Sequence, residues 1–197
     1  MNSKLLLLFL LLFPFFLLAQ VHIGVNVGGG LDNMVSLRAA VPLEIELSKT
    51  LSLQPALTYT QQHTPALLFR LGNLRNYRQA TIGYVGVPVV LKIRIPFESF
   101  IFYAMAGPQV DYATSLNVNY LEDGIFGTKK LDFEQVQIAR WDMSVVSGIG
   151  VEKVIHNNCK IRFELLHLLG VMDIDKQRDS AIYTEGKVFN LGFMIPL

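Results

Sequence analysis

Residues 51–62, LSLQPALTYTQQ, carry the pattern that decides the fold. In an extended strand, successive side chains point to opposite faces. The first face of this stretch is Leu51, Leu53, Pro55, Leu57, Tyr59 and Gln61, and the second is Ser52, Gln54, Ala56, Thr58, Thr60 and Gln62. The stretch therefore predicts a strand with one largely apolar face and one face of small or polar side chains.

The same alternation recurs along the chain. The predicted strands span residues 21–30, 37–47, 51–62, 84–94, 100–112, 141–152, 160–169 and 187–197. Each has about the 9–11 residues with which a tilted strand crosses a bilayer. We find no segment with a convincing helical period, so we expect an all-β chain.

The composition favours a membrane protein. Only 17% of the 197 residues are charged, against about 25% in soluble domains. No internal stretch reaches the ~18–20 apolar residues of a spanning helix, which leaves a soluble β-rich core or a transmembrane barrel. The net charge of +1 gives no sign of a nucleic-acid partner. The single cysteine, Cys159, excludes an intramolecular disulfide and a zinc cluster.

The N-terminus has the features of an export signal. Lys4 supplies a positive charge, residues 5–18 form an apolar run, and Ala19 is a small residue suited to cleavage. We expect residues 1–19 to be a signal peptide and residues 20–197 to form the barrel domain.

Connections of two lengths alternate along the chain. The short ones are residues 48–50, 95–99 and 153–159, and the long ones are residues 63–83, 113–140 and 170–186. Outer-membrane barrels have short periplasmic turns and longer external loops. The pattern predicts an eight-stranded antiparallel up-and-down transmembrane β-barrel.

Alternation alone does not decide which face is inside, because a soluble sandwich would bury its apolar face. Aromatic residues gather near the strand ends, as in the interfacial girdles of membrane barrels: Tyr59, Tyr112 and Trp141 toward the long loops, and Phe97, Phe100 and Phe193 toward the short turns. We therefore expect the apolar face to meet lipid.

The polar face carries charges of both signs. The basic residues are Arg38, Lys92, Arg94, Lys160 and Arg162, and the acidic ones are Glu44, Glu46, Asp111, Asp142, Glu152 and Glu164. Side chains fill the interior of an eight-stranded barrel, and buried charges must be paired. We expect a polar lumen plugged by an ion-pair network, with no open aqueous pore.

Four groups of residues resemble one family. They are Leu53, Gln54, Pro55, Leu57 and Tyr59; Tyr84, Val87, Pro88 and Lys92; Gly107 and Pro108; and Asp142, Gly148, Gly150 and Glu152. In this order they resemble the PorT-like outer-membrane β-barrel family of Gram-negative bacteria. The resemblance implies an OmpA- or OmpX-like barrel in the cell outer membrane, with a role linked to protein secretion. The chain departs from the pattern by ending in Pro196–Leu197 instead of an aromatic residue.

No motif for catalysis is evident. The histidines are His22 on the polar face, His63 in a loop, His156 in a turn and His167 in phase with the apolar face. No His-x-Ser pair and no HExxH motif occurs. We assign no catalytic, cofactor-binding or metal residues and expect no cofactor and no enzyme. Two alternatives stay open: a soluble periplasmic ligand-binding barrel, or an outer-membrane lipid-modifying enzyme.

The long loops are the expected contact regions, since loops carry specific function on a rigid scaffold. Arg70, Arg75 and Arg78 make one loop basic, and Glu122, Asp123, Asp132 and Glu134 make the next acidic. We expect the partners to be outer-membrane lipid, including lipopolysaccharide at the basic loop, and secretion or envelope proteins. The expected role is structural or accessory at the cell envelope.

Overall fold

The structure, a computed structural model, describes residues 20–32, 35–65, 77–122, 125–134, 138–173 and 183–197. Its strands are β1 (Gln20–Gly30), β2 (Val35–Glu46), β3 (Leu51–Pro65), β4 (Tyr77–Phe97), β5 (Phe100–Glu122), β6 (Ile125–Lys130), β7 (Trp141–Val154), β8 (Lys160–Gly170) and β9 (Glu185–Pro196), with a 3-10 turn, η2 (His156–Asn158). The predicted signal peptide lies outside the described residues. Among those described, no helix is long and apolar enough to cross a membrane.

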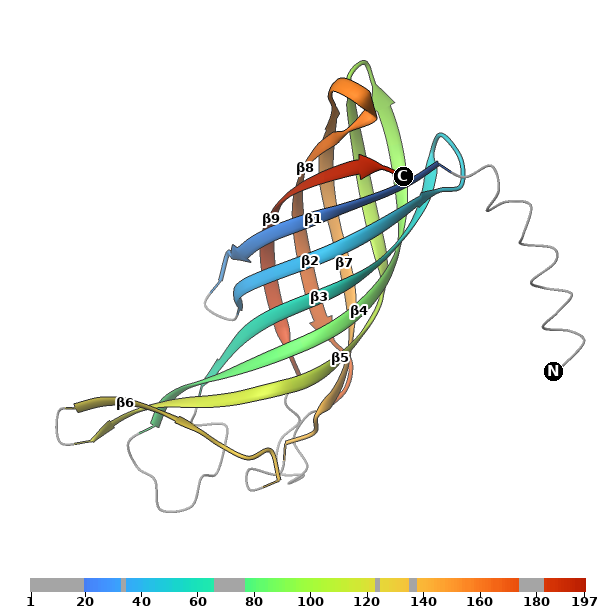
Figure 1. Cartoon of the computed structure of the whole chain (residues 1–197). Helices are drawn as coiled ribbons and strands as arrows, with labels where there is room; N and C mark the ends of the chain where they lie inside the picture. Colours follow the sequence, from blue (N-terminus) through green and yellow to red (C-terminus); the bar gives the residue numbers. More distant parts are fainter. Residues whose placement is uncertain (1–19, 33–34, 66–76, 123–124, 135–137, 174–182) are drawn as a thin grey trace, which may run out of the picture.

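Eight of the strands form a closed antiparallel barrel (Figure 1). The hydrogen-bonded order is β4-β3-β2-β1-β9-β8-β7-β5, and β5 also pairs with β4, which closes the cylinder. Each strand pairs with the next in sequence except that β7 pairs with β5, because β6 forms an outer hairpin with β5. The predicted eight-stranded up-and-down barrel is confirmed.

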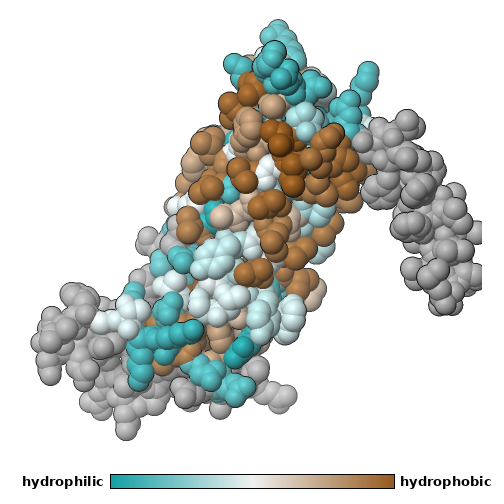
Figure 2. Space-filling view, in the orientation of Figure 1, coloured by the Kyte–Doolittle hydropathy of each residue, from teal (hydrophilic) through white to brown (hydrophobic). Residues whose placement is uncertain are grey.

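The barrel is apolar outside and polar inside. Leu57 is 57% exposed, whereas the next residue, Thr58, is 2% exposed. Figure 2 shows hydrophobic side chains over the wall, with hydrophilic ones gathered at the short-turn end and around the outer hairpin. Apolar side chains point outward and charged side chains point inward, which excludes a soluble sandwich. The predicted orientation, with the apolar face outside and the polar face in the lumen, is confirmed.

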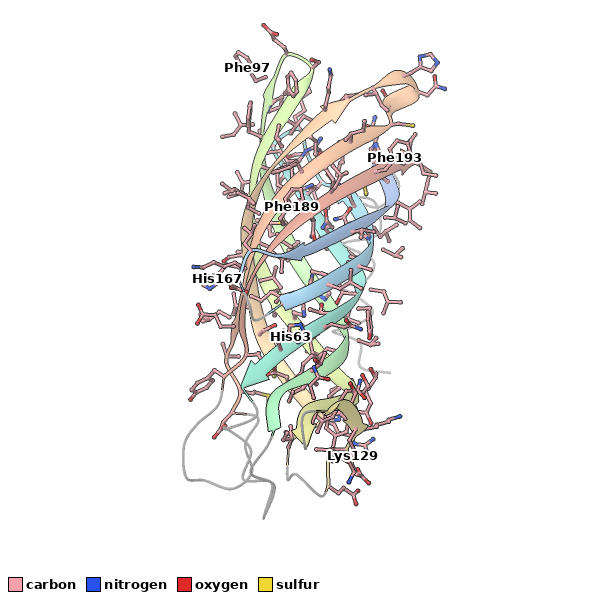
Figure 3. The ribbon with its side chains drawn as sticks, turned by 90° about the vertical axis from the view of Figure 1, so that its left-hand side faces the viewer. His63, Phe97, Lys129, His167, Phe189 and Phe193 are labelled. Carbon is pink, nitrogen blue, oxygen red and sulfur yellow. The ribbon has the colours of Figure 1, made fainter. Side chains whose placement is uncertain are left out.

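The aromatic girdles lie where predicted. Phe97 and Phe193 are exposed near the short-turn end (Figure 3). At the other end Trp141 is exposed on the outer wall and packs edge-on against Tyr112, with ring centroids 4.9 Å apart. Aromatic rings at these two levels mark the membrane interfaces, with amphipathic Trp and Tyr at the long-loop end.

Two predicted loops are shorter than the sequence indicated. β4 and β5 stay paired as far as Tyr77↔Tyr120, so much of residues 63–83 and 113–140 is strand, and β6 was not predicted. The extension persists because its inner face is covered. Ala80, Ile82 and Leu116 are buried there beneath Phe133 and Ile138.

This outer apolar cluster consists of Ala80, Ile82, Tyr84, Ala113, Leu116, Val118, Phe133 and Ile138, with Leu131 packed against it. Leu131 N–H also donates to the carbonyl of Leu116 at 2.9 Å. The chain after β6 therefore folds back over the β4–β5 extension, as a small packed core would in a soluble domain.

Candidate functional site

The half of the lumen that lies toward the short turns, called the inner half below, contains eight buried or nearly buried charged side chains. The acidic members are Glu44, Glu46, Glu152 and Glu164, and the basic members are Lys92, Arg94, Lys160 and Arg162. They come from β2, β4, β7 and β8 because each lies in phase with the inward face of its strand. We call this set the inner charge network.

Glu44 lies at the centre of the inner charge network. Its Oε2 atom is 2.9 Å from Lys92 Nζ and 2.6 Å from Arg162 NH2. Its Oε1 atom accepts a hydrogen bond from Ser52 Oγ at 3.3 Å and lies 3.6 Å from Lys160 Nζ. One carboxylate thus joins cations from opposite walls of the barrel.

The two central cations have further partners. Lys92 Nζ lies 2.6 Å from Glu152 Oε1 and 3.9 Å from the centroid of the Tyr103 ring. Arg162 contacts Glu152 at 3.0 Å and donates to Gln54 Oε1 at 2.8 Å. Since both cations are fully buried, this density of partners offsets their loss of hydration.

Glu46 lies at the opening of the barrel at the short-turn end. It lies 2.8 Å from Arg94 NH1 and 2.6 Å from Lys160 Nζ. His22 Nδ1 is 3.6 Å from the same carboxylate. The predicted ion-pair network is therefore real, and it reaches the inner opening of the barrel.

A layer of buried apolar residues lies next to the inner charge network, on the side toward the long loops. The sequence analysis did not predict it. It comprises Val35, Val90, Tyr103, Met105, Val146, Leu166, Leu168 and Val188. Val90, Val146 and Leu166 lie in phase with the polar face, and this parity is the signal that could have identified them. The lumen is not polar throughout.

A small cavity of about 20 Å³ lies beside this layer. Asn26, Arg38 and Asn190 line it, and each has a buried polar atom without a hydrogen-bond partner. A volume of this size holds about one water molecule. The cavity can satisfy polar atoms but offers no room for a solute of metabolite size.

In the outer half of the lumen, charged side chains form hydrogen bonds with neutral ones. Arg38 donates to Thr60 Oγ1 and Gln109 Oε1, both at 3.0 Å, and Gln109 Nε2 in turn donates to Asp111 at 2.7 Å. Asp142 accepts from Thr184 Oγ1 at 2.7 Å. The predicted pairing of every lumenal charge with an opposite charge is thus too simple at this end.

The histidines do not converge. His22 is buried in the lumen and His156 lies in η2. His63 belongs to β3, where its Nδ1 lies 2.9 Å from Thr81 Oγ1, so its assignment to a loop was wrong. His167 is on the outer wall as predicted (Figure 3), with Nε2 3.2 Å from Glu185 Oε1. Among the described residues no group of three or more His, Cys, Asp or Glu could hold a metal ion.

One row of polar side chains crosses the outer wall. Ser147 on β7 is the register partner of His167 on β8. His167 in turn pairs in register with Lys187 on β9 and contacts Glu185. The row interrupts the apolar band on β7, β8 and β9.

The charged loop residues are described in part. Arg70, Arg75 and Asp123 lie outside the described residues, while Arg78 falls in β4 and Glu122 in β5. Asp132 is 3.7 Å from Arg140 and accepts a hydrogen bond from Glu134 N–H at 3.2 Å. The acidic cluster expected in this region is thus partly neutralised by a local cation.

A closed barrel with an apolar outer band, two aromatic girdles and a filled lumen is a transmembrane β-barrel. Residues 17–176 match the family described as outer membrane protein beta-barrel domain. The chain belongs to this family, and its location is the outer membrane.

Three solved structures are similar to the chain, and Neisserial surface protein A shows the shared fold. Neisserial surface protein A is 8% identical, with a TM-score of 0.51, over 89% of this chain and 96% of that one. The N-terminal β-barrel domain of Pseudomonas aeruginosa OprF is 12% identical, with a TM-score of 0.45, over 89% and 97%. The outer membrane enzyme PagL is 12% identical, with a TM-score of 0.48, over 89% and 99%. No curated protein matches the sequence.

Proposed function

We propose that the protein is a non-conducting, non-enzymatic barrel that anchors its β4–β5–β6 extension at the cell surface, where it contacts a protein of the envelope. The observation that carries this proposal is the filled lumen. The inner charge network, the apolar layer and the outer apolar cluster follow one another from the short-turn end outward. An ion crossing the barrel would have to displace the side chains of the first two.

The extension supplies a contact surface. Within the described residues β6 is hydrogen-bonded on one side only, to β5. An open strand edge can pair with an extended segment of another chain. Lys129 (Figure 3) and Lys130 are the last two residues of β6, at the base of the hairpin, and would favour an acidic partner segment. The resemblance to the PorT-like family supports a partner from protein secretion.

Site-specific cross-linking tests the contact. A photoreactive amino acid replaces Thr128, which is exposed in β6, and a control replaces Lys49 in a short turn at the opposite end. We expect a protein adduct from Thr128 in intact cells and none of the same mass from Lys49. Adducts shared by both positions would refute the proposed contact, and stepwise single-channel currents in a planar bilayer would refute the closed lumen.

We also propose lipopolysaccharide as a lipid partner of the basic loop. Its phosphates would meet Arg70, Arg75 and Arg78, because guanidinium groups bind phosphate in a bidentate manner. Replacing the three by glutamine should reduce the lipopolysaccharide that copurifies with the protein. Unchanged copurification would refute this contact.

A second candidate function is modification of an outer-leaflet lipid, and the row of Ser147, His167 and Glu185 supports it. A serine, a histidine base and a carboxylate are the parts of an acyl hydrolase. We favour the first proposal because Ser147 lies in β7, which is paired with β5 on one side and with β8 on the other. The backbone N–H groups beside Ser147 are therefore used in the sheet and are not free to stabilise an oxyanion. A fluorophosphonate probe decides: labelling lost in Ser147→Ala but kept in Ser144→Ala, the lumenal control, would establish the enzyme.

A further inference from the structure

The lipid-facing wall has an apolar depression near the short-turn end. Its volume is about 440 Å³, and its outward-facing lining residues are Ile95, Phe102, Ala104, Ile149, Val151, Phe163 and Leu165. Ala104 is the smallest of these and pairs in register with Ile93 and Ile149. The hollow therefore lies over Ala104, between larger side chains from β4, β7 and β8.

A cation, Lys153, lies beyond this depression on the side toward the short turns. Lys153 is on the same face of β7 as Val151 and two residues farther along, which is about 7 Å in a strand. Its register partner is Phe100, and Lys153 Nζ is 5.5 Å from the centroid of that ring. Lys153 is exposed, so its ammonium can reach the headgroup level while its stem lies along the wall.

The ligand follows from this geometry. The short turns of an outer-membrane barrel face the periplasm, so Lys153 lies at the interface of the periplasmic leaflet. An apolar hollow that leads to a cation fits an acyl chain attached to a phosphate. We propose that the depression binds one glycerophospholipid of the periplasmic leaflet, with its phosphate on Lys153 and an acyl chain over Ala104.

The wall contains its own control. A second outward depression, of about 310 Å³, is lined by residues that include Val25, Ala39, Val41, Leu57 and Tyr59. Neither lining contains a lysine or an arginine. The two depressions offer similar apolar contact, and the first differs by Lys153, which follows Val151 by two residues on the same face of β7. The proposed site depends on the orientation of the barrel and not on the partner proposed for β6, so the two can fail separately.

Native mass spectrometry of the purified protein with added phosphatidylglycerol tests the site. We expect one retained lipid in the wild type and loss of this adduct in Ala104→Phe, which fills the hollow, while Ala39→Phe keeps it. Lys153→Ala should weaken phosphatidylglycerol binding about fivefold, the effect of one lysine near an anionic headgroup. Lys129→Ala, on the outer hairpin, should not. Equal loss in Ala104→Phe and Ala39→Phe, or none in Lys153→Ala, would overturn the proposal.

A measurement on the wild-type protein tests the site even if the variants fail to fold. Phosphatidylglycerol with a photoreactive acyl chain should label peptides that contain Ala104 and Ile149 in preference to the peptide that contains Ala39. Even labelling around the barrel would mean that this lipid is ordinary bilayer solvent and would also overturn the proposal.

Discussion

Replacing Glu44 by glutamine should strongly destabilise the barrel. The inner charge network has four acidic and four basic members, so its net charge is zero (4 − 4) and becomes +1 (4 − 3) in this variant. Glu44 is 0% exposed and contacts both Lys92 and Arg162 within 3 Å. Removing one partner of such a buried pair costs about 3–5 kcal/mol.

The assay is urea unfolding in phospholipid vesicles. Trp141, the only tryptophan, is 59% exposed on the outer wall and reports transfer out of the bilayer. Glu98→Gln, in an exposed turn, is the matched control and should change the free energy of unfolding by less than about 0.5 kcal/mol. Adding Lys92→Met to Glu44→Gln restores neutrality (3 − 3), so the double variant should be more stable than the sum of the single losses predicts.

Two results would refute this reasoning. A loss for Glu44→Gln no larger than that for Glu98→Gln would show that water or lipid headgroups reach the network and screen it. Strict additivity of the Glu44 and Lys92 variants would show that the 2.9 Å contact between them carries no coupling.

Three further predictions concern other layers of the barrel. Leu57→Arg should cost about 2–4 kcal/mol near the membrane midplane, whereas Thr58→Arg meets the crowded lumen instead; unfolding in vesicles compares the two, and a harmless Leu57→Arg would contradict the facing of β3. Phe133→Ala should cost about 3–5 kcal/mol locally, which limited proteolysis would detect as cleavage of the β5–β6 hairpin while the heat-modifiable gel mobility of the barrel persists. Gly150→Leu should prevent folding, because a side chain there collides with the Tyr103 ring, and wild-type gel mobility would contradict this packing.

The membrane-spanning part of the fold could be predicted because its information is local. Leu57 and Thr58 fall on opposite faces by parity alone, and both lie where the alternation places them. The members of the inner charge network follow by the same rule. Their pairing did not, because Lys92 and Glu44 are 48 residues apart and Arg162 and Glu44 are 118 apart. Such contacts depend on the stagger of a closed sheet.

The outer extension could not be predicted because its strands depend on tertiary packing. Residues 80–83 and 113–119 lack a clean apolar-out pattern. Ala80 and Val118 are buried in a cluster with Phe133 and Ile138, which lie far along the chain. The lumenal apolar layer differs in this respect, because Val90, Val146 and Leu166 lie in phase with the inward face of their strands and parity alone would have identified them.

The inner charge network and the outer apolar cluster connect different parts of the chain. The inner charge network connects β2 and β4 to β7 and β8 through the lumen, so it forms only when both halves of the chain are in place and favours the closed barrel over a partly paired sheet. The outer cluster joins β4 and β5 to the segment that directly follows β6. Its contacts also join distant positions, since Ala80 and Phe133 are 53 residues apart (133 − 80), but all its members lie between residues 80 and 138. The inner charge network therefore depends on strands from both halves of the chain, whereas the outer apolar cluster depends only on β4, β5 and the segment between β6 and β7.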